Sequence, residues 1–206
     1  RPKDIQEGIK VLKSNKLTIG SKTLNFEQAF TKKLKIKNSL MVNSGSSANL
    51  LALQCLINPY RKKRLKRGDE VIVPSLCWST SLWPIVQSGL KPVFVDINIS
   101  TLNIDLNDLK KKINKKTKAI LLVHVLGNCT DMSELMKIKK KNNLFLIEDT
   151  CESLGSKYDN RYLGTFGDFS SFSFYASHQI SSGEGGMLCC KDADDYEIIK
   201  SLRSHG

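Results

Sequence analysis

The sequence lacks a long hydrophobic run, a Cys-x-x-Cys pair and any internal repeat. No apolar stretch approaches the roughly 18 residues that a membrane-spanning helix needs, and the first residues carry no apolar core of a signal peptide. The six cysteines form no Cys-x-x-Cys pair, which argues against a zinc ribbon and against a disulfide framework. These absences predict a soluble protein of the reducing cytoplasm, without membrane insertion.

What is present is enough for one large folded domain. The chain has 206 residues, of which 40% are hydrophobic and 25% charged. Its 32 lysines and arginines against 20 acidic residues give a net charge of +12, a value that could indicate a nucleic-acid partner. The basic residues, however, recur as short separate runs at 61–67, 110–116 and 137–141, next to helical patterns. We therefore interpret them as solvated helix faces and expect no nucleic-acid partner.

Apolar periodicity predicts alternating helices and buried strands. Spacing near 3.6 residues predicts helices at 5–12, 26–34, 48–57, 106–113, 132–138 and 196–202. Short apolar runs predict strands at 71–73, 93–95, 119–123 and 144–147, and further strands at 169–174 and 186–190. This alternation indicates an α/β fold with a parallel sheet, whose ligands bind beyond the carboxyl ends of the strands.

Three candidate ligand-binding segments follow apolar runs. Small and hydroxyl residues at 43–47 precede a helix, where free N–H groups favour a phosphate, although a simple N-cap turn explains them equally well. Asp149 ends an apolar strand, so its carboxylate is expected to be hydrogen-bonded, paired or near a cation, and the simpler alternative is a helix N-cap. Trp78 follows another strand and either stacks on a flat ligand or fills the core.

Together with residues 170–178 and 183–186, these three segments resemble the DegT/DnrJ/StrS family of pyridoxal-phosphate sugar aminotransferases. The resemblance runs through SGSSANL, GDEVIVP, PVFVDI, IEDTCESLG, GTFGDFSSFSF and GEGG, in this order along the chain. It implies the large domain of a fold-type I aminotransferase, with a mainly parallel central sheet flanked by helices. Residues 1–206 would be an N-terminal segment plus this cofactor-binding domain, and the small C-terminal domain would be missing from the chain.

The resemblance also assigns roles to the candidate residues. Gly45, Ser46 and Ser173 would hold the phosphate of pyridoxal or pyridoxamine 5'-phosphate. Trp78 would stack on the pyridine ring, and Asp149 would pair with the ring nitrogen so that the ring acts as an electron sink.

Two positions depart from the aminotransferase pattern. Glu152 stands where family members often carry glutamine, near the face or the hydroxyl side of the ring. Five residues after Ser173, the aminotransferases have the lysine that binds the cofactor covalently, whereas this sequence has His178. Histidine cannot form that bond but can transfer protons near neutral pH. The substitution is similar to the sugar 3-dehydratases of the family, so His178 and Asp149 are the expected catalytic residues.

The expected activity is loss of the C3 hydroxyl from a nucleotide-linked 4-keto-6-deoxy sugar, in dideoxysugar synthesis for the lipopolysaccharide O-antigen. Glutamate would be the amino donor and the enzyme a homodimer. Trp78, the DTCES segment at 149–153 and the ending RSHG favour the GDP-sugar subtype. Three alternatives stay open: an ordinary aminotransferase, a non-catalytic regulatory relative, and the iron–sulfur CDP-sugar subtype. In that last subtype Cys151 would be a cluster ligand, whereas otherwise no metal site is expected and Cys151 is a small buried residue.

Overall fold

The computed structural model describes residues 2–204, so the last two residues of the RSHG ending, 205 and 206, lie outside the described part. The helices are α1 (Pro2–Lys13), α2 (Ser21–Leu34), α3 (Gly45–Ile57), α4 (Ser79–Gln87), α5 (Leu106–Lys112), α6 (Met132–Asn142) and α7 (Ala193–Ser204), with a short 3-10 helix η1 (Val125–Gly127). The strands are β1 (Asn38–Val42), β2 (Glu70–Pro74), β3 (Lys91–Val95), β4 (Ile97–Asn98), β5 (Asn103–Ile104), β6 (Thr117–Val123), β7 (Phe145–Asp149), β8 (Lys157–Tyr158), β9 (Arg161–Tyr162), β10 (Phe169–Ser173) and β11 (Gly186–Cys190).

A seven-stranded sheet has the order β1-β11-β10-β7-β6-β2-β3. Strands β10, β7, β6, β2 and β3 are parallel, whereas β11 runs antiparallel to both neighbours. The predicted α/β fold with a mainly parallel sheet is therefore confirmed, and the two later strands do join the same sheet. Because β1 and β10 both pair antiparallel with β11, β1 points the same way as the parallel strands. The carboxyl ends of β1, β10, β7, β6 and β2 thus share one edge.

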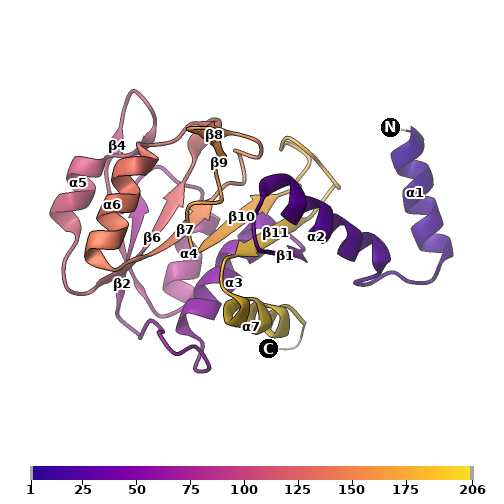
Figure 1. Ribbon diagram of the computed structural model, residues 1–206, viewed down its shortest axis with the longest axis horizontal. Coiled ribbons are helices and arrows are strands. Elements are labelled where there is room, and N and C mark those ends of the chain that lie inside the picture. The colour runs from indigo at the N-terminus through magenta and orange to yellow at the C-terminus, as the bar shows by residue number, and fades with distance from the viewer. Residues whose placement is uncertain (1, 205–206) are drawn as a thin grey trace.

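Helices cover both faces of this sheet (Figure 1). The buried side chains of α3, α4 and α7 pack on one face, where they meet Val71 and Leu121. Helices α5 and α6 pack on the other face against Ile72 and Ile120, and α2 extends that layer over β10 and β11. Neighbouring residues of a strand thus face opposite layers, as the period of two in a β-strand requires. Strand β6, for example, is buried on both sides, which explains its continuous apolar run at 119–123.

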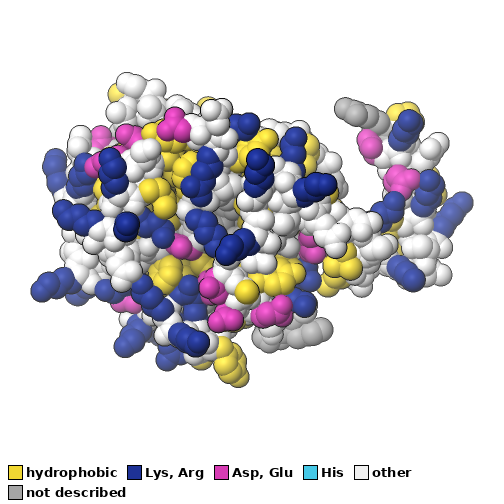
Figure 2. Space-filling model, in the orientation of Figure 1, with side chains coloured by type: hydrophobic (Ala, Val, Ile, Leu, Met, Phe, Trp, Pro, Cys, Tyr) yellow, Lys and Arg dark blue, Asp and Glu magenta, His cyan; other side chains and the backbone are white. Residues whose placement is uncertain are grey.

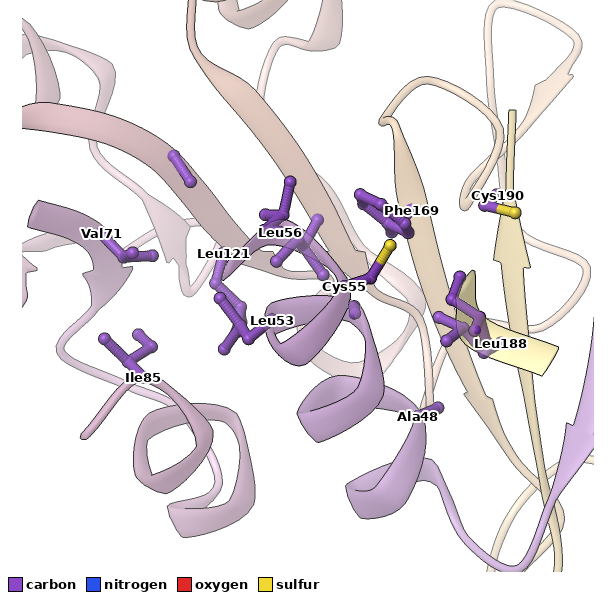
Figure 3. Close-up of a cluster of buried hydrophobic side chains, with 14 of the residues drawn as sticks. Ala48, Leu53, Cys55, Leu56, Val71, Ile85, Leu121, Phe169, Leu188 and Cys190 are labelled. Carbon is purple, nitrogen blue, oxygen red and sulfur yellow. The ribbon is translucent and has the colours of Figure 1, made fainter. Parts of the chain in front are cut away.

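Helix α3 forms the centre of one core layer (Figure 3). Ala48, Leu53 and Leu56 are fully buried, and they face strand residues such as Phe169 and Leu188. Full burial of a leucine side chain contributes about 1.5–3 kcal/mol to folding. This packing fixes α3 firmly, and with it the start of the helix at the carboxyl edge of the sheet.

The molecular surface carries many basic side chains, in keeping with the net charge of +12. Figure 2 shows lysine and arginine side chains spread over one face, between apolar and acidic ones. The runs at 110–116 and 137–141 lie in or beside α5 and α6 and are mostly exposed, as predicted. Arg61 differs, because it forms a largely buried ion pair with Asp195. Within residues 2–204, no helix is both long enough and apolar enough to cross a membrane.

Helix α4 is the main element that the sequence patterns did not predict. Its sequence STSLWPIVQ contains Pro84 in the helix interior, where proline normally disfavours a helix because it lacks an N–H group. Tertiary packing of the fully buried Ser81 and Ile85 overrides that local preference. The segment matters because α4 contributes side chains to the candidate site.

Candidate active site

The carboxyl edge of the sheet brings together the predicted cofactor residues. Asp149 ends β7 and Ser173 ends β10, and these strands are neighbours. Helix α3 begins at Gly45, three residues after the end of β1 at Val42. A Cβ atom added to Gly45 would lie 2.4 Å from Sγ of Cys151 and 3.0 Å from Cβ of Ser173. The first turn of α3 therefore contacts the segments that follow β7 and end β10, and only glycine fits this approach.

The first turn of α3 offers free backbone donors. The side chain of Ser44 caps the helix by accepting a hydrogen bond from the N–H of Ser47 at 3.1 Å. The N–H groups of Gly45 and Ser46 have no acceptor within the helix, and the helix dipole makes this end positive. The hydroxyl of Ser46 also donates to that of Thr80 at 2.9 Å. The starts of α3 and α4 are thereby joined, and the arrangement suits an anion such as a phosphate.

Asp149 is 6% exposed and is held by uncharged groups from three segments. Its Oδ2 accepts hydrogen bonds from Nδ2 of Asn49 at 2.7 Å and from the hydroxyl of Ser81 at 2.8 Å. Its Oδ1 accepts one bond, from the backbone N–H of Cys151 at 3.2 Å. Within residues 2–204, no lysine or arginine forms an ion pair with this carboxylate. A buried anion that lacks a cationic partner suits a ligand that brings its own positive charge.

Two thiols lie in the field of this carboxylate. Burial and the negative charge of Asp149 raise the pKa of Cys77, and the same two causes raise the pKa of Cys151 well above its ordinary value. Both side chains are therefore neutral thiols near pH 7 in the protein without bound ligands. Within the described part of the chain, no three His, Cys, Asp or Glu side chains are grouped to hold a metal ion.

The residue before Asp149 anchors the neighbouring loop. Glu148 is fully buried, and its carboxylate accepts hydrogen bonds from backbone N–H groups of Gly164, Phe166 and Gly167 at 2.6–2.9 Å. Nε2 of the equally buried His124 lies 2.9 Å from the same carboxylate. Burial raises the pKa of Glu148, but the hydrogen bonds from His124 and the backbone outweigh it and hold the pKa below its ordinary value.

His178 lies in the loop between β10 and β11, which returns to the candidate site. Its backbone N–H donates to the carbonyl of Tyr175 at 3.0 Å, and the two rings meet edge to face with centroids 6.2 Å apart. The imidazole is partly exposed and forms no side-chain hydrogen bond with residues 2–204. The next residue, Gln179, donates to the backbone carbonyl of Glu152 at 2.5 Å. The loop that carries His178 is thus tied to the segment after Asp149.

Glu152 and Trp78 lie at the borders of the site. Glu152 is exposed, and its carboxylate accepts a hydrogen bond from the N–H of Leu126 at 3.0 Å. Trp78 immediately precedes α4, the helix whose Ser81 binds Asp149, and its side chain is 75% exposed. The indole ring therefore does not fill the core, so the core interpretation of Trp78 is wrong.

Three polar residues of this site were not predicted from the sequence. Asn49 and Ser81 are 1% and 0% exposed, and they bind Asp149 across 100 and 68 positions of the chain. Thr80 joins the two helix starts. Asn49 did carry a signal, because a polar side chain inside the apolar helix pattern at 48–57 needs a partner. Ser81 and Thr80 carried none, since α4 itself was not predicted.

A cavity of about 950 Å³ lies elsewhere, at the opposite edge of the sheet. Its lining includes the beginning of β10 and the end of β11, together with basic residues such as Lys37, Arg161 and Lys191. None of the predicted cofactor residues lines it. This cavity is therefore separate from the candidate active site.

Comparison with known proteins gives consistent matches along the whole chain. The sequence model of the DegT/DnrJ/EryC1/StrS aminotransferase family matches residues 1–206. The chain is 44% identical over 196 residues to GDP-4-keto-6-deoxy-D-mannose 3-dehydratase of Escherichia coli O55:H7, a match that covers 95% of this chain and 50% of the relative.

Solved structures resemble the fold closely. A GDP-4-keto-6-deoxymannose-3-dehydratase with a trapped PLP-glutamate geminal diamine has a TM-score of 0.92 and 42% identity, covering 98% of this chain and 52% of that chain. Helicobacter pylori PseC, an aminotransferase involved in the biosynthesis of pseudoaminic acid, has a TM-score of 0.90 and 33% identity, covering 98% and 53%. The chain spans about half the length of the curated relatives it matches.

Proposed function

Because the chain belongs to the DegT/DnrJ/EryC1/StrS aminotransferase family, we propose that it is the cofactor-binding part of a sugar 3-dehydratase. The observation that carries this proposal is His178, five residues after Ser173, where the family's aminotransferases have their cofactor-binding lysine. The whole loop at 174–185 contains no lysine. An ordinary aminotransferase is therefore the weaker candidate, because no neighbouring residue of this loop replaces the missing amine.

The residues present fit pyridoxal or pyridoxamine 5'-phosphate. The buried carboxylate of Asp149, which has no lysine or arginine partner within residues 2–204, would face the ring nitrogen. The turn at Gly45 and Ser46, with Ser173, would hold the phosphate. The exposed indole of Trp78 is free to stack on the ring. When bound, the cofactor supplies an electron sink for the reacting carbon of the sugar. The carboxylate keeps the ring nitrogen protonated, which that chemistry requires.

His178 would be the acid-base residue. An imidazole can accept a proton at one ring nitrogen and return it, which is what acid-base catalysis requires. The edge contact with the ring of Tyr175 orients the imidazole without occupying either nitrogen. Glu152 fits a direct role less well, because its carboxylate already accepts a hydrogen bond from Leu126. A contact from Glu152 to the ring stays a prediction.

We propose the same substrate class as for the dehydratase relatives. The protein would remove the C3 hydroxyl of a nucleotide-linked 4-keto-6-deoxy sugar, a GDP-sugar in the first instance, with glutamate as the amino donor. It would act in the cytoplasm in O-antigen synthesis, as a homodimer. Residues 1–206 would be the N-terminal segment and large domain of a longer protein, in keeping with the half-length matches.

Replacement of His178 tests the proposal. His178→Asn should retain the cofactor but dehydrate GDP-4-keto-6-deoxymannose about 100-fold more slowly, the usual contribution of a positioned acid-base group. Borohydride reduction of the unaltered protein should leave no cofactor on any lysine, whereas His178→Lys should gain such an adduct at position 178. Dehydration at the parental rate by His178→Asn, or a required lysine adduct in the unaltered protein, would refute the dehydratase assignment.

A further inference from the structure

We propose that Ser81 and Asn49 are positioning residues that orient Asp149 towards the cofactor, an inference that rests on the proposed function. The two side chains come from α4 and α3, helices whose starts are joined by the bond between Ser46 and Thr80. Both reach the same carboxylate oxygen, Oδ2, at 2.8 and 2.7 Å. This convergence of two separate helices on one oxygen atom is the central observation.

The direction of both hydrogen bonds is fixed by chemistry. An ionised carboxylate only accepts, so the hydroxyl of Ser81 and the amide nitrogen of Asn49 must donate. A flip of the Asn49 amide would place its carbonyl oxygen against the carboxylate. In the orientation found, Oδ1 of Asn49 is buried and has no hydrogen-bond partner. Leaving a buried carbonyl unpaired is costly, so the bond to Asp149 dictates how this side chain lies.

The pattern of donors leaves one oxygen of Asp149 available. Oδ2 accepts two side-chain bonds, whereas Oδ1 accepts the 3.2 Å bond from the N–H of Cys151, whose thiol also lies against the carboxylate. Two donors from rigid helices stop the carboxylate from rotating, so that Oδ1 retains a free lone pair in a fixed direction. A positive charge on the ligand would find its partner already oriented, which is the advantage of a preorganised site.

Neutral donors also preserve the charge of the carboxylate. A lysine or arginine in place of Ser81 or Asn49 would compensate the anion and weaken its hold on a protonated ring nitrogen. The titratable groups facing Asp149 are the thiols of Cys77 and Cys151, whose raised pKa values keep them neutral. Asp149 is thus oriented without being neutralised, as an electron-sink partner requires.

Ser81→Ala tests this inference, and Ser88→Ala is its matched control. Ser88 is also buried and follows the same helix, but its hydroxyl accepts from Gln54 rather than donating to Asp149. In the protein loaded with pyridoxamine phosphate, Ser81→Ala should lower kcat about tenfold with little change in KM, the effect of one charge-assisted hydrogen bond. The pH at which the ring nitrogen loses its proton, followed by absorbance, should fall by about one unit.

A double-mutant cycle separates positioning from structure. Affinity for pyridoxamine phosphate, measured by fluorescence titration, should weaken about tenfold in Ser81→Ala but not further when the change is added to Asp149→Asn. Asn49→Leu, which removes the other donor, should likewise weaken affinity for pyridoxamine phosphate in the unaltered protein but not further in Asp149→Asn. An equal loss of affinity in both backgrounds, or spectra of Ser81→Ala identical to those of Ser88→Ala, would overturn the inference.

The same measurements distinguish failure of this inference from failure of the proposed function. If Asp149→Asn binds pyridoxamine phosphate and turns over the sugar like the unaltered protein, Asp149 has no cofactor role and both proposals fail. If Asp149→Asn is impaired but Ser81→Ala and Asn49→Leu are not, the cofactor role stands and only the positioning inference is refuted. Melting temperatures of the cofactor-free variants identify any simple loss of folding.

Discussion

Replacement of the buried carboxylate of Glu148 by an amide should destabilise the protein in a pH-dependent way. Oε1 of Glu148 accepts from Phe166 and Gly167, and Oε2 accepts from Gly164 and lies beside His124. A glutamine keeps one oxygen, which will face the two N–H groups of Phe166 and Gly167. Its amide nitrogen then opposes the N–H of Gly164, which loses its acceptor.

The size of the effect follows from these contacts. An unsatisfied buried donor costs about 1–3 kcal/mol, and replacing an ionised acceptor by a neutral one weakens each remaining bond. His124 offers little compensation, because its Nδ1 is buried without a partner and a change of tautomer would leave a proton there unpaired. We expect Glu148→Gln to lower the free energy of unfolding by about 3 kcal/mol at pH 7.

The sign of the pH dependence is fixed by the lowered pKa of Glu148. The charged form contributes its stability above the unfolded-state pKa, near the ordinary 4.5, and that contribution is lost as pH falls through the lower folded-state value. The difference between the unaltered protein and Glu148→Gln should therefore be full at pH 7 and shrink below about pH 4. Urea titrations of the cofactor-free protein measure it, with the exposed Glu197→Gln as the control. A difference that is absent at pH 7, or that grows on acidification, would refute the reasoning.

The sequence predicted the architecture well because the central strands are buried on both faces. Runs such as 119–123 are apolar throughout, and this pattern requires helices on either side of a sheet. The antiparallel β11 was not predicted as such, because strand direction depends on the path of the loop at 174–185 rather than on the strand's own residues. Helix α4 was missed because Pro84 argues locally against a helix that distant packing stabilises.

The site was predictable only where a residue's own position in a strand or helix was informative. Asp149 was found because a carboxylate at the end of an apolar strand needs a hydrogen-bond donor or a nearby cation. His178 was found from the resemblance alone, since nothing in its local pattern distinguishes it. Ser81 and Asn49 were missed because their importance lies in a shared partner far along the chain, and no local pattern encodes that convergence.

Two further predictions test the scaffold around the site. Asp195→Asn should lower the free energy of unfolding by about 3 kcal/mol in urea titrations and leave cofactor affinity unchanged, because it leaves the largely buried Arg61 without its counter-ion. Gly45→Ala should weaken binding of pyridoxamine phosphate, since the new Cβ would lie 2.4 Å from Sγ of Cys151 and push the first turn of α3 away from the strand ends. Adding Cys151→Ala removes that sulfur atom but leaves the 3.0 Å contact with Ser173, so fluorescence titration should show partial recovery. Absence of any recovery would mean that crowding by the thiol does not set the position of this turn.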